Sequence, residues 1–294
     1  MKSLLEALRR GRPLVSDGAW GTFLYQRGLQ PGECPELWNV TRRADVAAIA
    51  ESYIAAGADL ILTNSFGGTP HKLAAFGLAE RAAELNEAAA AISRAAAGDD
   101  HFVLGSMGPT GVMLMMGEVD EETLAEGFAI QAAALKKGGA DGLCLETFSA
   151  LDEACLAIRA AKAVTGLEVA CTFTFEKTPA GEFRTMMGVS PEEMTEAVKE
   201  AGADIIGTNC GNGFEQMIEI VRAIRRVDAT TPVLVHANAG KPLYVDGRTV
   251  FPESPADMAA RVDELIAAGA NLVGGCCGTG PAHIRAIAER IRGR

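Results

Sequence analysis

A four-residue motif that recurs four times constrains the fold of this chain more than any other feature. Each copy has glycine second and Asp or Asn last, and each lies between a helical pattern and an apolar run; the copies are 56–59 (AGAD), 138–141 (GGAD), 201–204 (AGAD) and 268–271 (AGAN). Glycine can adopt the left-handed conformation that ends a helix, and its small neighbours allow a tight turn into a strand. The motif therefore predicts repeated strand–helix units that turn at the bottom of a barrel, where a repeat serves stability.

Short apolar runs alternate with helical patterns along the chain. We expect strands at about 13–17, 60–65, 102–107, 142–148, 169–175, 205–210, 233–238 and 272–277. Helical patterns lie at about 43–57, 79–97, 120–138, 150–165, 191–202, 213–227, 255–269 and 281–292. This alternation implies parallel strands joined by helical crossovers, and eight units imply a closed barrel. The predicted fold is therefore α/β, a (β/α)8 TIM barrel that forms a single domain over residues 1–294.

Composition narrows the class of protein. The formal net charge of −11 argues against nucleic acid as a partner, because phosphate binding relies on clusters of Lys and Arg. Residues 1–12 lack the apolar core of a secretory signal, and no apolar run reaches the roughly 18 residues that a membrane helix needs. The seven cysteines, an odd number, argue against a secreted disulfide framework. We therefore expect a cytoplasmic protein with no membrane partner.

The ends of the predicted strands are polar, whereas their interiors are rich in Leu, Ile and Val. In a barrel of this kind the active site forms at the carboxyl ends of the strands. The longest irregular segment, about 18–42, also begins at such an end, and a loop of that length is often functional. The strand ends are therefore the place to look for chemistry.

Three cysteines stand at two of these strand ends. Cys210 follows one apolar run, and Cys276 and Cys277 follow another, with two glycines before the pair and Gly278 after it. Neighbouring side chains on a regular strand point to opposite sides, so both can bind one ion only if the backbone leaves strand geometry, which glycine permits. Three thiolates leave one position open on a tetrahedral Zn²⁺, as catalytic rather than structural zinc sites do.

A zinc ion held by three thiolates is a weak Lewis acid toward water, but it can hold a soft sulfur substrate as a thiolate. This favours alkylation of a thiol over hydrolysis. The alternative is that such cysteines are small core residues. We give that interpretation to the remaining four, which are Cys34, Cys144, Cys155 and Cys171.

Other strand-end residues have two possible roles each. Glu146 and Asp17 directly follow apolar runs and could bind an ammonium group, or could serve in a salt bridge or a helix cap. Asn238 could face the metal or bind a backbone carbonyl group. His236 lies two residues earlier on the same side of the strand, and we expect it to support the core. The glycine-rich segment around the cysteine pair also resembles a barrel phosphate site, although the cysteines argue against that use.

Several motifs are similar to those of one known family. They are Asp17-Gly18-Ala19 with Gly21-Thr22, Thr63-Asn64-Ser65-Phe66, Gly108-Pro109, Glu146-Thr147-Phe148, Gly207-Thr208-Asn209-Cys210, Asn238-Ala239-Gly240-Lys241-Pro242 and Gly274-Gly275-Cys276-Cys277-Gly278-Thr279. Over nearly the whole chain they resemble the homocysteine S-methyltransferase family. The resemblance is closest to the homocysteine-binding barrel of cobalamin-dependent methionine synthase, and the two cysteine motifs are its most specific part.

The resemblance implies a zinc-dependent S-methyltransferase that activates homocysteine as a thiolate and methylates it to methionine. Cys210, Cys276 and Cys277 would be the catalytic zinc ligands. Asn238 would be a fourth ligand without substrate, and the homocysteine sulfur would displace it. The sulfur would then attack a methyl group in line.

The resemblance also implies how the amino-acid part of homocysteine is bound. Asp17 and Glu146 would hold the amino group, and backbone amides near Gly18, Ala19 and Thr147 would receive the carboxylate. In betaine-using relatives the motif at 146–148 would read Glu-Tyr-Phe, and its tyrosine is a zinc ligand. Thr147 cannot replace that phenol, which disfavours betaine as the methyl donor.

The methyl donor and the acceptor stay open. In full-length methionine synthase the barrel precedes folate and cobalamin modules that this sequence does not include, so we expect a separate methylcorrinoid protein or a small methyl donor such as S-methylmethionine. Three alternatives remain: a zinc methyltransferase for another small thiol, a barrel lyase or synthase for a phosphorylated substrate, and a non-catalytic thiol-binding subunit.

Overall fold

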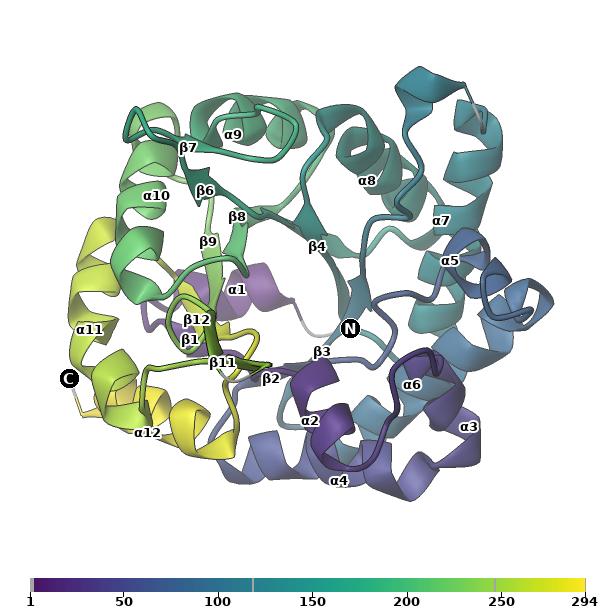
Figure 1. The fold of residues 1–294 in the computed structure, drawn as a ribbon, viewed down its shortest axis with the longest axis horizontal. Helices are drawn as coiled ribbons and strands as arrows, with labels where there is room; N and C mark the ends of the chain where they lie inside the picture. Colours follow the sequence, from purple (N-terminus) through teal and green to yellow (C-terminus); the bar gives the residue numbers. More distant parts are fainter. Residues whose placement is uncertain (1–2, 118, 246, 294) are drawn as a thin grey trace.

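Parallel strands wind around a common axis in the computed structural model of the chain, which describes residues 3–117, 119–245 and 247–293 (Figure 1). The eight barrel strands are β1 (Leu14–Val15), β2 (Leu60–Leu62), β3 (Phe102–Met107), β4 (Gly142–Phe148), β5 (Glu168–Phe173), β8 (Ile205–Asn209), β9 (Val233–Ala237) and β12 (Leu272–Gly275). They form one sheet in the order β1-β12-β9-β8-β5-β4-β3-β2, with parallel pairing throughout. The predicted single-domain (β/α)8 barrel is confirmed.

Helices form a ring outside the strands (Figure 1). The predicted ones are present as α4 (Arg43–Ala55), α6 (Ala82–Ala97), α7 (Glu121–Lys137), α8 (Leu151–Thr165), α9 (Pro191–Glu200), α10 (Phe214–Val227), α11 (Pro255–Ala268) and α12 (Pro281–Arg292). Side-chain caps fix several of their starts. Ser190 and Ser254 each form a capping box with an acidic residue three positions later, at the first turns of α9 and α11.

The repeated four-residue motif joins the barrel strands in pairs. In each copy the last side chain accepts a hydrogen bond from the amide of a valine on the preceding strand, and its own amide donates to the carbonyl of that valine. The pairs are Asp59 with Val15, Asp141 with Val103, Asp204 with Val169 and Asn271 with Val233, at 2.7–2.9 Å. The second-position glycine of each copy (Gly57, Gly139, Gly202 and Gly269) has φ between +99° and +119°. The stabilising role predicted for the motif therefore has a specific basis: it fixes β1 to β2, β3 to β4, β5 to β8, and β9 to β12.

The clamp at Asp59 spans a seam in the barrel. Within the described residues, no ladder of backbone hydrogen bonds joins β1 to β2. Asp59 holds this seam at the bottom. At the top, Oδ2 of Asp17 accepts a hydrogen bond from the amide of Leu62 at 2.7 Å. Hydrogen bonds to the side chains of Asp59 and Asp17 therefore join these two strands in place of a backbone ladder.

The barrel interior changes from apolar to polar along the strands. Its lower part is filled by Leu14, Leu60, Leu62, Leu104, Cys144, Ala170, Ile205, Leu234 and Leu272, and Leu4 of helix α1 (Leu4–Arg9) packs beneath them. Glu168 holds α1 in place by accepting hydrogen bonds from the amides of Leu4 and Leu5. Two residues further along the same strands, the buried side chains become polar, namely Ser106, Glu146, Thr172 and His236. These polar side chains form the floor of the barrel mouth.

Some boundaries and small elements differ from the prediction. The segment 18–42 is mostly helical rather than irregular, with α2 (Gly21–Gln26), the 3-10 turn η1 (Pro35–Leu37) and α3 (Trp38–Thr41). A short helix α5 (Pro70–Ala74) follows β2, and 3-10 turns occur at η2 (Ala79–Arg81) and η3 (Leu114–Met116). Two hairpins were not predicted: β6 (Glu176–Lys177) with β7 (Phe183–Arg184), and β10 (Leu243–Val245) with β11 (Arg248–Val250). Among the described helices, none has the length and apolar character needed to cross a bilayer.

Candidate metal centre and active site

The three strand-end cysteines converge at the barrel mouth. The Sγ atoms of Cys210, Cys276 and Cys277 all lie within 4.8 Å of one another, and those of Cys210 and Cys277 are 3.9 Å apart. Sulfur atoms about 2.3 Å from a tetrahedral zinc ion would be about 3.8 Å apart, so the spacing is close to that of a metal site. The structure thus brings together the three predicted ligands.

Asn238 lies beside this cluster. Its side chain hydrogen-bonds to Cys210, and its Oδ1 atom is buried without a hydrogen-bond partner. A buried oxygen without a partner is costly unless something binds it. The three sulfurs and this oxygen therefore form a donor set that a metal ion would satisfy.

The backbone leaves strand geometry where the cysteines need it to. β12 ends at Gly275, and the chain turns through the cysteine pair with Gly278 at φ +82°. The turn is tied down because Thr279 Oγ1 donates to the carbonyl of Cys276 at 2.7 Å. A side chain at Gly278 would collide with the ring of Phe251, at 2.3 Å from the nearest atom. The expectation that glycine allows both sulfurs to face one point is confirmed.

The cysteine thiols share their protons unequally. Hydrogen bonds from Cys276 and Cys277 hold the pKa of Cys210 well below its usual range. The same contact with Cys210 raises the pKa of Cys276 far above its usual range. The cluster therefore carries one thiolate readily, and a metal cation would be needed to stabilise three.

Glu146 lies at a bulge of β4, and it follows the interior residue Cys144 by two positions on the same face of the strand. Leu145 is in register with Cys171 and Phe148 with Phe173, so β4 has one residue more than β5 between these pairs. The carboxylate is buried and accepts a hydrogen bond from the hydroxyl of Ser106. Burial raises the pKa of Glu146 to about 7, and the charges of Asp17 and Cys210 add to this. A bound cation would restore its charge.

Asp17 is buried at the same end of the barrel and is already well partnered. Besides the amide of Leu62, its carboxylate accepts hydrogen bonds from Trp20 Nε1 at 2.8 Å and Ser16 Oγ at 3.2 Å. Desolvation nevertheless raises its pKa to about 6. His236 supports this group, since its Nε2 lies 2.8 Å from Ser16 Oγ, and burial lowers the pKa of His236 to about 4. His236 is thus buried, as expected of a core histidine.

The backbone amides predicted to bind a carboxylate are only partly available. The amide of Ala19 donates to Thr279 Oγ1 at 3.1 Å, and that of Thr147 donates to Asn209 Oδ1 at 2.8 Å. Both amides therefore have partners in the absence of substrate, and the role of the amides near Gly18, Ala19 and Thr147 in receiving a substrate carboxylate stays a prediction. Gly18 packs against Tyr53 and Thr279, where a Cβ would lie within 2.9 Å of either side chain. The acceptor for the Thr147 amide is the side chain of Asn209, a residue to which the sequence analysis assigns no role.

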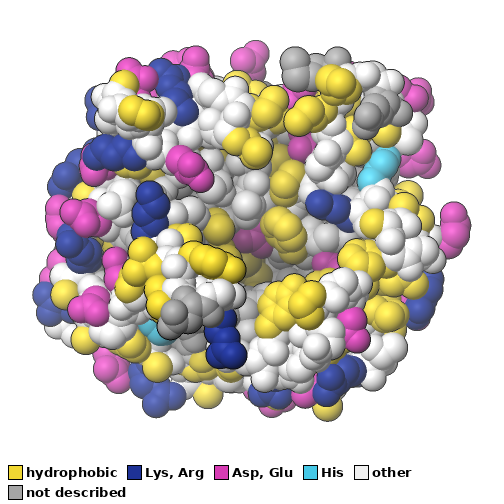
Figure 2. Space-filling model, in the orientation of Figure 1, with side chains coloured by type: hydrophobic (Ala, Val, Ile, Leu, Met, Phe, Trp, Pro, Cys, Tyr) yellow, Lys and Arg dark blue, Asp and Glu magenta, His cyan; other side chains and the backbone are white. Residues whose placement is uncertain are grey.

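A cavity of about 870 Å³ opens beside the floor of the mouth. Thr147 and Thr174 line its inner side, and Met113 and Met187 line its outer side. Figure 2 shows the mouth as a hollow in the centre of this face, with hydrophobic side chains around it and acidic side chains in its depth. Of the predicted site residues, Thr147 lines this cavity.

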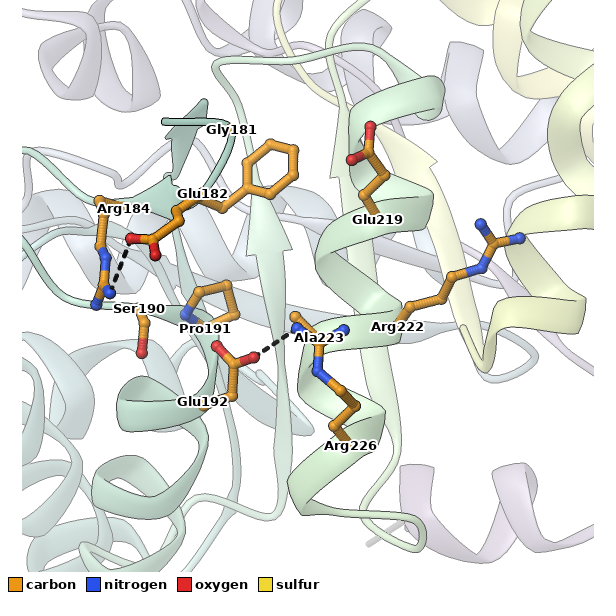
Figure 3. Close-up of a pocket in the computed structure, with 11 residues that line it drawn as sticks. Gly181, Glu182, Arg184, Ser190, Pro191, Glu192, Glu219, Arg222, Ala223 and Arg226 are labelled. Atoms are coloured by element: carbon orange, nitrogen blue, oxygen red, sulfur yellow. Dashed lines mark hydrogen bonds and ion pairs between the residues drawn. The ribbon is translucent and has the colours of Figure 1, made fainter. Parts of the chain in front are cut away.

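A second pocket, of about 580 Å³, lies outside the barrel between the β6–β7 hairpin, α9 and α10. Figure 3 shows two ion pairs among its side chains, Arg184 with Glu182 and Arg226 with Glu192; Glu219 and Arg222 pair with Lys177 and Glu264, which do not line it. None of the predicted site residues lines it. The remaining cysteines (Cys34, Cys144, Cys155 and Cys171) are buried and free, as expected of core residues.

Comparison with known proteins points to one family. A sequence model of the homocysteine S-methyltransferase family matches residues 14–291. Methionine synthase from Mycobacterium tuberculosis is 34% identical over 308 aligned positions, which cover 98% of this chain and 25% of that protein. Methionine synthase from Mycobacterium leprae matches to the same extent. The chain thus spans about a quarter of the length of these curated relatives.

Solved structures agree with the fold. The metallated form of the homocysteine methyltransferase MmuM from Escherichia coli superposes with a TM-score of 0.80 at 24% identity, covering 98% of this chain and 99% of that one. The oxidized form of the same protein gives a TM-score of 0.78 at 25% identity, covering 98% of this chain and all of that one. The likeness extends over the whole barrel.

Proposed function

Because the chain belongs to the homocysteine S-methyltransferase family, we propose that it transfers a methyl group to the sulfur of homocysteine and so forms methionine. The observation that carries the proposal is the position of the three-cysteine cluster: it lies at the same barrel mouth as two buried carboxylates. A thiol amino acid offers a sulfur for the first group and an ammonium for the second.

We propose zinc as the metal. Cys210, Cys276 and Cys277 would hold it, with Asn238 Oδ1 completing the set in the absence of substrate. Zinc, when bound, is a Lewis acid that keeps a ligated substrate sulfur as thiolate at neutral pH. Sulfur ligands favour zinc over magnesium or calcium, which prefer oxygen.

Glu146 would bind the ammonium group of homocysteine, with Asp17 contributing its charge from nearby. Both carboxylates have raised pKa values because they are buried. An ammonium ion beside them would favour their ionised forms. The amino group is thus recognised by electrostatics, and the sulfur at the other end of the substrate is placed at the cysteine cluster.

The transfer itself needs an activated sulfur and a donor held in line with it. A lone pair of the sulfur forms the new S–CH₃ bond while the bond from the methyl carbon to the donor breaks, and the electrons of that bond leave with the donor. The cavity beside Thr147 and Thr174 would admit the donor. A methylcorrinoid protein and a small methyl donor both remain candidates.

One experiment tests the proposal directly. Zinc-loaded protein would be incubated with homocysteine and, in separate reactions, methylcobalamin, betaine and S-methylmethionine, and methionine would be measured. Parallel reactions with mercaptoethanol test whether the acceptor is homocysteine or any small thiol. Formation of methionine that stops on chelation supports the proposal. Full activity in a zinc-free preparation, or no methionine with any donor, would count against it.

A further inference from the structure

We propose that Asn209 is a positioning residue that holds the Glu146–Thr147 bulge in place and so sets where the ammonium-binding carboxylate stands relative to Cys210. This inference rests on the proposed function, because it assigns the amino group of the substrate to Glu146. It concerns a residue whose side chain bonds to Thr147 and Thr172 and not to the cysteine sulfurs.

The bulge in β4 leaves a defect that something must fill. The extra residue between Leu145 and Phe148 interrupts the ladder between β4 and β5. Thr147 lies in this bulge with φ +66°, a left-handed conformation that a β-branched side chain rarely adopts. An amide displaced from its ladder needs another acceptor, and a strained residue needs contacts that hold it.

The side chain of Asn209 supplies the acceptor for the Thr147 amide and the contacts that hold Thr147 in its left-handed conformation. Its Oδ1 accepts from the Thr147 amide at 2.8 Å, and its Nδ2 donates to Thr147 Oγ1 at 2.7 Å. Thr172, on the strand between β4 and β8, donates its hydroxyl to the same Oδ1 at 2.8 Å. Asn209 is fully buried, so these bonds are protected from water. The carboxamide is well matched to this position, because it both donates and accepts.

The main chain of Asn209 leads directly into the metal cluster. Cys210 has φ +60°, and it and Thr147 are the two non-glycine residues with positive φ in the described part of the chain. Thr174 Oγ1 donates to the carbonyl of Asn209 at 2.9 Å, and the amide of Cys210 donates to the carbonyl of His236 at 2.9 Å. Asn209 is thus bonded to two residues with left-handed backbones: Thr147 through its side chain and Cys210 through the peptide bond.

This arrangement predicts a specific effect on substrate recognition. Without Asn209, Thr147 can relax toward an ordinary conformation, and Glu146 moves with it. The ammonium end of homocysteine should lose its partner while the sulfur end is unaffected. The matching probe is 4-mercaptobutanoate, which has the thiol and the carboxylate of homocysteine but no amino group.

The first measurement uses the metal-free protein and amide hydrogen exchange resolved to single residues. Asn209→Ala should increase exchange at the Thr147 amide by about tenfold or more, since its buried acceptor is gone. Asn86→Ala is the matched control. It removes a buried asparagine that bonds the carbonyls of Gly68 and Ala82, and it should leave exchange at Thr147 unchanged. Unchanged exchange in Asn209→Ala would overturn the proposal, whatever the protein's activity.

The second measurement compares the binding of homocysteine and 4-mercaptobutanoate to zinc-loaded protein by calorimetry. In Asn209→Ala, the preference for homocysteine should fall by about tenfold, with the affinity for 4-mercaptobutanoate within about twofold of wild type. Equal weakening of both ligands, or loss of bound zinc, would show that Asn209 acts on the metal cluster or the fold and would overturn the proposal. If wild type itself fails to bind homocysteine, the proposed function fails, and the exchange measurement still tests Asn209.

A rescue experiment separates positioning from general damage. Glycine adopts positive φ without needing support. In a Thr147→Gly background, Asn209→Ala should therefore reduce the preference for homocysteine much less than it does in wild type, by about twofold rather than tenfold. An undiminished tenfold effect in that background would contradict the proposed route through Thr147.

Discussion

Replacing Glu146 with glutamine should stabilise the substrate-free protein while weakening homocysteine binding. The carboxyl group has its pKa raised by burial from 4.5 to about 7. A group whose pKa is higher in the folded state stabilises the fold fully at low pH, and this contribution is lost as the pH rises through the folded-state pKa. Above pH 7 the buried, ionised carboxylate therefore lowers the free energy of unfolding.

The size of the effect follows from the two pKa values. The difference between 4.5 and about 7 corresponds to about 3 kcal/mol at pH 8, at about 1.4 kcal/mol for each pH unit. Glutamine is neutral, and it can still accept the hydrogen bond from Ser106. Allowing for relaxation around the charge, we expect Glu146→Gln to gain about 1–3 kcal/mol at pH 8 and less than about 1 kcal/mol at pH 5.

Urea unfolding of the metal-free protein at the two pH values measures this gain. Asp228→Asn is a control of opposite sign. Burial disfavours the charge of Asp228, but hydrogen bonds from Lys199, Thr231 and Thr230 outweigh burial and hold its pKa below the usual range. Its removal should destabilise the protein at pH 8. A loss of stability in Glu146→Gln at pH 8, or an equal gain at both pH values, would refute the reasoning. Homocysteine binding to the zinc-loaded variant should weaken by at least about tenfold.

Three further outcomes are expected. Cys276→Ser should abolish zinc binding and activity, whereas Cys155→Ser, at a buried position in α8, should keep both; equal zinc content in the two variants would argue against the three-sulfur site. Gly207→Ala should lower the free energy of unfolding in urea by about 3 kcal/mol or more, because the new Cβ would lie 1.9 Å from the Leu234 carbonyl oxygen. The control Gly21→Ala should leave stability unchanged, because its Cβ would meet no atom within 4 Å. Asp59→Ala should lower the melting temperature more than Asp141→Ala, because β1 and β2 lack the ladder that joins β3 and β4; equal losses would contradict this role of Asp59.

The barrel could be predicted from the sequence because its signals are local. Each apolar run became a strand, and the second-position glycine of each motif copy took the left-handed conformation expected of it. The differences lie at strand ends and in the segments between the barrel strands, namely the two hairpins and the helices within 18–42. β1 is predicted to continue to residue 17 but ends at Val15; beyond it, the side chain of Asp17 accepts from the Leu62 amide and its carbonyl accepts from the Gly275 amide.

The three-cysteine cluster was predictable from glycine-flanked cysteines at strand ends, but the residues that hold the bulge beside Glu146 were less so. A left-handed threonine has no sequence signal, because β-branched residues favour strands. Asn209 could have been noticed by alternation, since it lies on the same side of β8 as Ile205, which faces the barrel interior. Its partner is 62 residues away along the chain, and only the folded structure shows that contact.

The four valine–aspartate or valine–asparagine clamps also bear on how such a chain could have arisen. They tie each odd-numbered barrel strand to the next one along the chain, and every clamp reuses the same turn. The natural building block is therefore a quarter of the molecule, with two strands and their helices. Duplication of a gene segment that encodes one such block would leave this fourfold pattern at the bottom of the barrel, whereas the strand ends at the opposite face differ from block to block.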